Sequence, residues 1–429
     1  MKKIVIVGGG AGGLELASQL GRKLGKSNKA LVTLVDQNRS HIWKPLLHEV
    51  ATGSLDTSTE GVVYHAHAAR NHYQFQLGRF IGLDSKEKRI RLDPLLDEQG
   101  NEVLPERSLS YDILILAIGS QSNDFGTPGV REQCYFLDNP AQAEKFHHAL
   151  LNRFMRLNQQ PERTGLNIAI VGAGATGVEL SAELHHVTRL LASYGMPNVD
   201  RRQLNINLIE AGPRILPALP ERISASARSE LSDLGVQVLE NTRIASASTD
   251  GFVTSEDQLI PADLMIWAAG VKAPDYVREL GVFELNKLNQ ILVKPTLQST
   301  VDDDIYIIGD CCGCQQEDGS WVPPRAQSAH QMASKVKENI LRSFKQQPLK
   351  PFRYYDHGSL VSLSKFSTVG SLMGNLTSNK MFIEGRLARF VYISLYRMHQ
   401  VKIHGKARAL LVIAADALNK AVKPKMKLH

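Results

Sequence analysis

Two glycine-rich loops of the same spacing could each hold the pyrophosphate of a dinucleotide. Residues 8–13 and 172–177 both match G-x-G-x-x-G, and each follows a short apolar run, 4–7 and 168–171. In this motif the first glycine permits a tight turn, the second lets the backbone approach the pyrophosphate, and the third allows close helix packing. The following helix directs free N–H groups and the positive end of its dipole at the phosphates. One chain is therefore predicted to bind two dinucleotides.

An acidic residue follows each loop at the end of the next apolar run. Asp36 closes the run 31–35, and Glu210 closes the run 206–209. A carboxylate in this position accepts hydrogen bonds from ribose hydroxyls. Glycine-rich turns are common in α/β proteins, so one copy alone would be weak evidence. The repetition of strand, loop and acid favours binding over a merely structural turn.

The elements around the loops are those of two parallel sheets. Three further apolar runs, 113–118, 264–269 and 305–308, each end at a glycine, as buried parallel strands do, and helical patterns lie between the strands. The sequence predicts an α/β protein with two doubly wound Rossmann-like domains and a C-terminal amphipathic, membrane-anchoring region. The predicted divisions are residues 1–165 and 286–350 for the first, discontinuous domain, 166–285 for the second domain, and 351–429 for the C-terminal region.

Charge is concentrated at the C-terminal end of the chain. Residues 380–429 contain eleven Lys and Arg against two acids, although the whole chain of 429 residues carries a net charge of only +7. The segment 387–397 could form an amphipathic helix. A second apolar stretch, 410–418, is followed by Lys420, Lys423, Lys425 and Lys427. This pattern predicts a membrane-surface segment attracted to anionic lipids, with no indication of a nucleic-acid partner. The alternative is a helix packed on the protein and a solvated basic terminus.

The chain resembles the flavoproteins with two dinucleotide folds, and most closely the bacterial type II NADH dehydrogenases, single-chain NADH:quinone oxidoreductases. The resemblance implies FAD in the first fold and NADH in the second. The implied contacts with FAD are Gly8, Gly10, Ala11, Gly12, Gly13 and Asp36; those with NADH are Gly172, Gly174, Gly177 and Glu210. Because a carboxylate repels the 2′-phosphate of NADPH, Glu210 predicts a preference for NADH, which the nearby Arg214 could soften.

The resemblance also assigns residues outside the two loops. It places Glu179 at the nicotinamide end of NADH, Asp310 at the ribityl and phosphate part of FAD, and Lys44 against the flavin. Backbone contacts with the cofactors are implied for Ala117, Gly119, Gly270 and Ala329.

The segment 324–331 resembles the quinone-site helix of the family. Gln327 and Gln331 are four residues apart, hence on one helical face, and glutamine amides can hydrogen-bond quinone carbonyls. His330 could face the flavin ring or solvent, and Lys365 is a weaker quinone candidate. Glu179, Gln327, Gln331 and His330 are therefore the predicted catalytic positions, and no metal is expected.

The expected reaction is hydride transfer from NADH to FAD and then transfer of two electrons to a membrane quinone, without proton pumping. The resemblance places the enzyme on the cytoplasmic face of the bacterial inner membrane and leaves a homodimer open. Disulfide reduction is disfavoured because residues 43–52 lack the cysteine pair that this chemistry requires.

Three other functions remain open at this stage: a soluble NADH-dependent reductase with another acceptor, an NAD(H)-sensing flavoprotein, and a sulfide:quinone oxidoreductase using Cys134 and the cluster 311–314. For Cys311 and Cys314 themselves, free thiols are favoured over a metal or redox pair.

Overall fold

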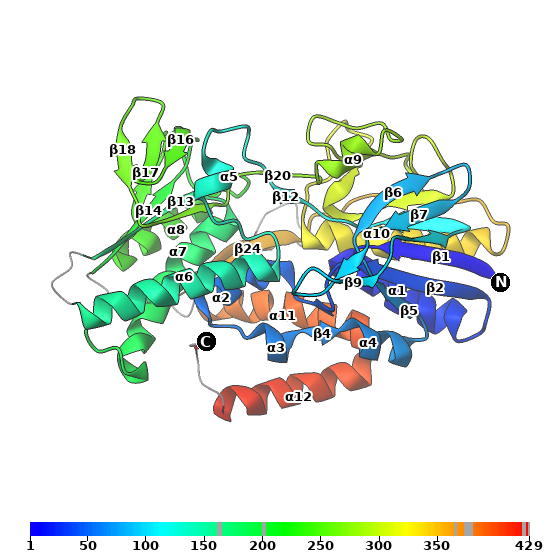
Figure 1. The fold of residues 1–429 in the computed structure, drawn as a ribbon, viewed down its shortest axis with the longest axis horizontal. Coiled ribbons are helices and arrows are strands. Elements are labelled where there is room, and N and C mark those ends of the chain that lie inside the picture. Colours follow the sequence, from blue (N-terminus) through cyan, green and yellow to red (C-terminus); the bar gives the residue numbers. More distant parts are fainter. Residues whose placement is uncertain (161–164, 200–202, 364–366, 373–380, 423–425, 428–429) are drawn as a thin grey trace.

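The protein consists of two α/β lobes with the C-terminal helices beneath them (Figure 1). The computed structural model describes residues 1–160, 165–199, 203–363, 367–372, 381–422 and 426–427. The first lobe lies on the right in Figure 1 and the second on the left. The predicted α/β class with two dinucleotide-binding folds is confirmed.

The first lobe is built on a five-stranded parallel sheet in the order β22-β11-β1-β2-β5. Its strands are β1 (Lys2–Val7), β2 (Ala30–Asp36), β5 (Gln74–Leu77), β11 (Ile113–Leu116) and β22 (Ile305–Ile307). In the register of this sheet, Ile4 lies opposite Ile113 on one side and Val32 on the other. These side chains are buried, as a sheet covered on both faces requires.

The second lobe repeats this arrangement with four parallel strands in the order β15-β14-β13-β19. The strands are β13 (Leu166–Val171), β14 (Leu204–Ile209), β15 (Gln237–Leu239) and β19 (Leu264–Trp267). In both lobes the strand that precedes the glycine-rich loop is central, so the loop emerges in the middle of the sheet at the carboxyl ends of the strands. This is where open α/β sheets bind ligands.

Helices cover both sheets. The helices of ten or more residues before residue 350 are α1 (Ala11–Leu20), α6 (Pro140–Gln159), α7 (Ala175–Leu191), α8 (Glu221–Leu234) and α10 (Ala326–Ser343). Phe146 and Phe154 of α6 are fully buried in the core of the second lobe, whereas Ala273 and Val277 pack in the core of the first. The domain divisions at 165 and 285 stay predictions; side-chain packing crosses both of them.

Smaller elements complete the lobes. Two antiparallel sheets are formed by β6 (Phe80–Asp84), β7 (Arg89–Leu92) and β10 (Arg107–Ser110), and by β16 (Ile244–Ser248), β17 (Gly251–Thr254) and β18 (Leu259–Pro261). The lobes are linked where β12 (Gln121–Ser122) pairs with β20 (Val271–Lys272). Other short pieces are β3 (Ser40–His41), α2 (Leu47–Thr52), α3 (Thr57–Glu60), β4 (Val62–Val63), α4 (Tyr64–Asn71), α5 (Val130–Gln133) and α9 (Tyr276–Glu279).

The C-terminal region contains a sheet that the sequence did not predict. Its antiparallel strands are β24 (Gly358–Leu363), β25 (Ser367–Leu372) and β26 (Met381–Glu384), followed by α11 (Gly385–His404) and α12 (Lys406–Val422). The predicted segment 387–397 lies within α11, and the segment 410–418 lies within α12. Among the described residues, no helix combines the length and the apolar character that crossing a bilayer requires.

Candidate active site

The two glycine-rich loops have the same backbone geometry. Gly8 and Gly172, the first glycines, have φ angles of +101° and +102°, which L side chains rarely adopt. Their N–H groups donate to Val35 and Ile209, the carbonyls near the end of the neighbouring strand, over 2.8 Å in both cases. The chain thus turns identically in both lobes.

The remaining glycines of each loop divide into packing and ligand positions. A Cβ atom at Gly13 or Gly177 would collide with the carbonyl oxygen of the first glycine of the same loop, so these positions let the helix lie against the turn. No atom lies within 4 Å of a Cβ added at Gly10 or Gly174, so the backbone is bare and open there. Both loops therefore fit a bound pyrophosphate, with α1 and α7 beginning directly beside it.

The two predicted ribose-binding carboxylates are held in equivalent places. Asp36 accepts a hydrogen bond from the N–H of Gly9 over 2.6 Å, and Glu210 accepts one from the N–H of Ala173 over 3.0 Å. Burial raises the pKa of Asp36, an effect that hydrogen bonds from Asn38 and Gly9 oppose. Each carboxylate is fixed by the loop itself at the end of its strand.

A cavity of about 410 Å³ opens at the first loop. The predicted flavin-site residues that line it are Gly8, Gly10, Asp36, Lys44, Ala117 and Gly119. Lys44 Nζ donates to the carbonyl of Ser120 over 2.9 Å, and Ser120 Oγ donates to Asp310 Oδ2 over 2.8 Å. Lys44 and Asp310, far apart in sequence, are thereby connected at one wall of this cavity.

The start of α10 packs directly on the first loop. A Cβ at Gly12 would lie 3.1 Å from the carbonyl oxygen of Ala329, and one at Gly309 would lie 3.6 Å from Cβ of Ala329. The structure therefore places Ala329 beside both Gly12 and Gly309, the residue before Asp310. Gly270 lies elsewhere, at the link between the lobes, where its carbonyl accepts a hydrogen bond from the N–H of Asn123.

The two glutamines of α10 share one face but are partly occupied by protein groups. Gln331 donates to the carbonyl of Tyr355 over 2.7 Å and accepts from its N–H over 2.9 Å. Gln327 hydrogen-bonds the backbone of residues 357 and 358. Gln331 keeps one N–H free among the described contacts, which suits a carbonyl ligand. Lys365 lies outside the described residues.

Glu179 lies where three elements meet. Its Oε1 accepts from the N–H of Ser362 on β24 over 3.0 Å, and its Oε2 is 3.6 Å from Nδ1 of His48 on α2. Both side chains are buried, and burial lowers the pKa of His48. Glu179 was expected from the family resemblance, whereas the sequence offered no signal for His48 or Ser362.

His330 has a different neighbour from those considered for it. Its Nδ1 hydrogen-bonds the buried carboxylate of Glu15 on α1, and its ring stacks on Trp43 with 5.5 Å between centroids. The side chain is 15% exposed, so Glu15 and Trp43 cover most of it. Glu15 was not predicted as a site residue, although an acid between Leu14 and Leu16 on an apolar helical stretch was a visible signal.

The cysteines are free thiols. Cys311, Cys312 and Cys314 are buried, and burial raises the pKa of Cys311 and Cys134 to about 12. High pKa values disfavour the thiolate that metal binding or thiol redox chemistry uses. The preference for free thiols over a reactive pair agrees with this.

Comparison with known proteins agrees with this geometry. Residues 2–333 match the family model for pyridine nucleotide-disulphide oxidoreductases. The type II NADH:quinone oxidoreductase of Haemophilus influenzae is 46% identical over the full length of both chains. The chain belongs to the type II NADH:quinone oxidoreductases. This membership agrees with the two loops, the cavity and the absence of cysteines from residues 43–52.

Solved structures of this family and its relatives show the same fold. NDH2 from Plasmodium falciparum in complex with NADH superposes with a TM-score of 0.82 at 19% identity, covering 99% of this chain and all of that one. The sulfide:quinone oxidoreductase of Aquifex aeolicus has a TM-score of 0.72 at 16% identity and covers 99% of this chain and 96% of that one. The type II enzymes thus share their fold with a sulfide:quinone oxidoreductase.

Proposed function

We propose that the protein oxidises NADH and reduces a membrane quinone through bound FAD, without pumping protons. The observation that carries this proposal is the pair of loops with equal backbone geometry, each open at its second glycine and flanked by a carboxylate. When bound, FAD accepts hydride from NADH and passes two electrons to the quinone. The protein supplies orientation and charge.

The residues around the first loop hold the flavin. Asp36 and Lys44, which line the cavity, would bind the adenosine ribose and lie beside the flavin, respectively, and Asp310 would bind the ribityl part. Ser120, which bridges Lys44 and Asp310, keeps both side chains at the cavity. These contacts orient the cofactor before any substrate arrives, which lowers the entropic cost of the reaction.

The residues around the second loop orient NADH. Glu210 binds the ribose and favours NADH, and Arg214 cannot easily oppose it because its guanidinium donates to the carbonyls of Leu219 and Pro217. Glu179 contacts the nicotinamide end and is itself held by Ser362. Gln331 donates its free N–H to the quinone, with Gln327 positioning the segment beside it.

The activity is tested with FAD-loaded protein in lipid or mild detergent. Rapid NADH oxidation that depends on a short-chain quinone analogue is expected. Flavin reduction by NADH without quinone-dependent turnover would contradict the proposal and favour another acceptor or a sensing role. Light scattering of the same protein in detergent measures its molar mass and so tests whether it forms the homodimer that the resemblance left open.

We further propose that α12 holds the enzyme on the cytoplasmic face of the inner membrane. Six exposed residues fall on one side of this helix and are all apolar: Ala407, Leu410, Leu411, Ala414, Ala415 and Leu418. We call this set the α12 apolar face. On the other side, buried Ala409 and an ion pair of 2.6 Å between Asp416 and Arg397 hold α12 against α11. An apolar helical face turned to the outside suits the lipid boundary.

The basic residues contribute less to this proposal than their number in the sequence suggests. Arg397 is engaged by Asp416, and Lys427 forms an ion pair of 3.4 Å with Asp56 rather than extending outward. Lys423 and Lys425 lie outside the described residues. Exposed Lys406 and Arg408 at the start of α12 remain next to the apolar face and suit anionic headgroups.

A further inference from the structure

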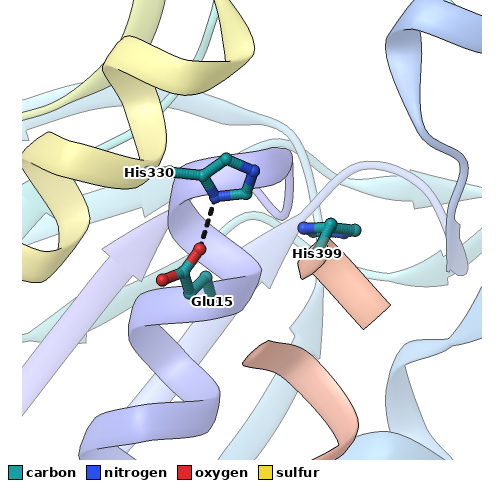
Figure 2. A group of neighbouring side chains, drawn as sticks. All are labelled: Glu15, His330 and His399. Carbon is teal, nitrogen blue, oxygen red and sulfur yellow. Dashed lines mark hydrogen bonds and ion pairs between the residues drawn. The ribbon is translucent and has the colours of Figure 1, made fainter. Parts of the chain in front are cut away.

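A carboxylate and two imidazoles from three different helices meet beside the first lobe (Figure 2). They are Glu15 of α1, His330 of α10 and His399 of α11, and one ligand atom from each lies within 4.8 Å of the others. Glu15 is fully buried, and its Oε2 is the atom hydrogen-bonded to His330. Figure 2 shows a ring nitrogen of His399 turned toward this pair.

One nitrogen of His399 has no partner among the described residues. Its Nε2 faces Nε2 of His41 over 3.1 Å, so the two rings share a hydrogen bond there. Nδ1 of His399 is buried and has no hydrogen bond. An unsatisfied buried polar atom is unfavourable unless another group binds it.

The surrounding groups prepare these side chains to bind a cation. Trp43 packs against both rings, with centroids 5.5 Å from His330 and 4.2 Å from His399, so neither imidazole can turn freely. A metal-ligating imidazole usually has its other ring nitrogen held by a fixed partner, and Nε2 of His399 is held in this way by His41.

We propose that Glu15, His330 and His399 form a binding site for a divalent transition-metal ion such as Zn²⁺. Two imidazoles and one carboxylate are a donor set that zinc proteins use, with a fourth position left for water. Ligand atoms within 4.8 Å of one another lie at most about 2.8 Å from a common centre, so bonds of about 2.0–2.2 Å require inward shifts below about 1 Å. The ion displaces the proton that Glu15 and His330 share, and this proton leaves to solvent.

The positive charge of Lys402 lowers the expected affinity for a metal ion but does not block the site. Lys402 Nζ lies 3.2 Å from Glu15 Oε1, and Gln19 donates to the same oxygen over 2.7 Å. Both groups therefore use Oε1, and Oε2 remains for the ion. The Lys402 side chain is 39% exposed and can turn toward solvent when a second positive charge arrives. For this reason we expect micromolar rather than nanomolar binding.

Binding would add a metal link among three helices that now meet by packing, hydrogen bonds and the Lys402–Glu15 ion pair. The ion joins α1 of the flavin fold to α10, which bears Gln331, and to α11, which leads into α12. A metal ion at this place holds α11 of the C-terminal region against α1 and α10. The site does not depend on the proposed quinone reduction, because it is defined by donor atoms alone.

The test is calorimetric titration of Zn²⁺ into the full-length, FAD-loaded, chelator-treated protein without NADH or quinone. One ion per chain is expected, with a higher melting temperature in its presence. Glu15→Gln and His399→Asn should each weaken binding at least tenfold. His148→Asn is the matched control, because His148 is exposed on α6 and should leave binding unchanged. Equal Zn²⁺ affinity in wild type and both site variants would overturn the proposal.

A second measurement covers variants that lose FAD or fail to fold. X-ray absorption of the Zn²⁺-loaded wild-type protein should show nitrogen and oxygen ligands, including two imidazoles. A sulfur ligand would place the ion at a cysteine and refute the site, as would the absence of bound zinc at sub-millimolar concentrations.

Discussion

Replacing the three leucines of the α12 apolar face by serine should release the enzyme from membranes without unfolding it. Leu410, Leu411 and Leu418 are 67%, 71% and 71% exposed, so they contribute little to the folded core. Full burial of a leucine side chain is worth about 1.5–3 kcal/mol, so roughly two-thirds of each side chain entering lipid gives about 1–2 kcal/mol. The triple variant should lose about 3–6 kcal/mol of membrane affinity, or roughly a 10²–10⁴-fold weaker partition.

The assay is flotation of purified protein with vesicles containing anionic lipid, at fixed ionic strength. The wild type should float with the vesicles, and the triple variant should remain in the soluble fraction with unchanged FAD content and melting temperature. Leu259→Ser is the control, because Leu259 is 52% exposed on β18, at the opposite end of the molecule from α12 (Figure 1). If the triple variant floats as well as the wild type, the α12 apolar face is not the membrane contact.

Three further predictions concern the two lobes. Gly177→Ala should lower the melting temperature because its Cβ would collide with the loop backbone, whereas Gly174→Ala should keep the wild-type melting temperature and lose NADH affinity in a fluorescence titration. Glu210→Ala removes a charged hydrogen-bond acceptor worth about 1.5–3 kcal/mol, so kcat/KM for NADH should fall about 10–150-fold. The ratio of NADH to NADPH activity should also fall, and an unchanged ratio would argue against ribose binding by Glu210. Burial, and then the charge of His404, lower the pKa of His67 to about 3, below its value in the unfolded chain. The stability that neutral His67 contributes to the fold is therefore complete above about pH 6.5 and is lost as the pH falls toward 3. The test is denaturant unfolding at pH 7 and pH 4.5. Between these pH values the free energy of unfolding of His67→Gln should fall by up to about 2–3 kcal/mol less than that of the wild type. Equal falls in the two proteins would refute this role of His67.

The two dinucleotide folds could be predicted because their determinants are local. Strand, loop, helix and acid follow one another within a single unit, and the same unit occurs twice, so each copy supports the other. The space left at Gly10 and Gly174, and the collisions that Gly13 and Gly177 avoid, agree with the roles that the motif assigns. Here residue type and spacing alone determine the geometry.

The contacts that complete the site could not be predicted, because they join segments that are far apart in the chain. Ser362 and Glu179 are 183 positions apart, and His41 and His399 are 358 positions apart. No local pattern places β24 against α7 or α11 against α1. Glu15 was not predicted either, although a carboxylate within an apolar helical stretch requires a buried partner; the sequence does not say which one.

The C-terminal region shows how charge can mislead when the partner of each charge is unknown. The sequence assigned both 387–397 and the terminal lysines to lipid. In the structure Arg397 neutralises Asp416, and Arg22 of the first lobe donates to the last carbonyls of α11 over 2.8 and 2.9 Å, which docks that helix on the protein. Among the described side chains of α12, the α12 apolar face is turned outward, with exposed Lys406 and Arg408 beside it. Within the described chain, no protein group covers these exposed apolar side chains, so they are available to enter lipid. They therefore support membrane attachment more strongly than the positive charges do.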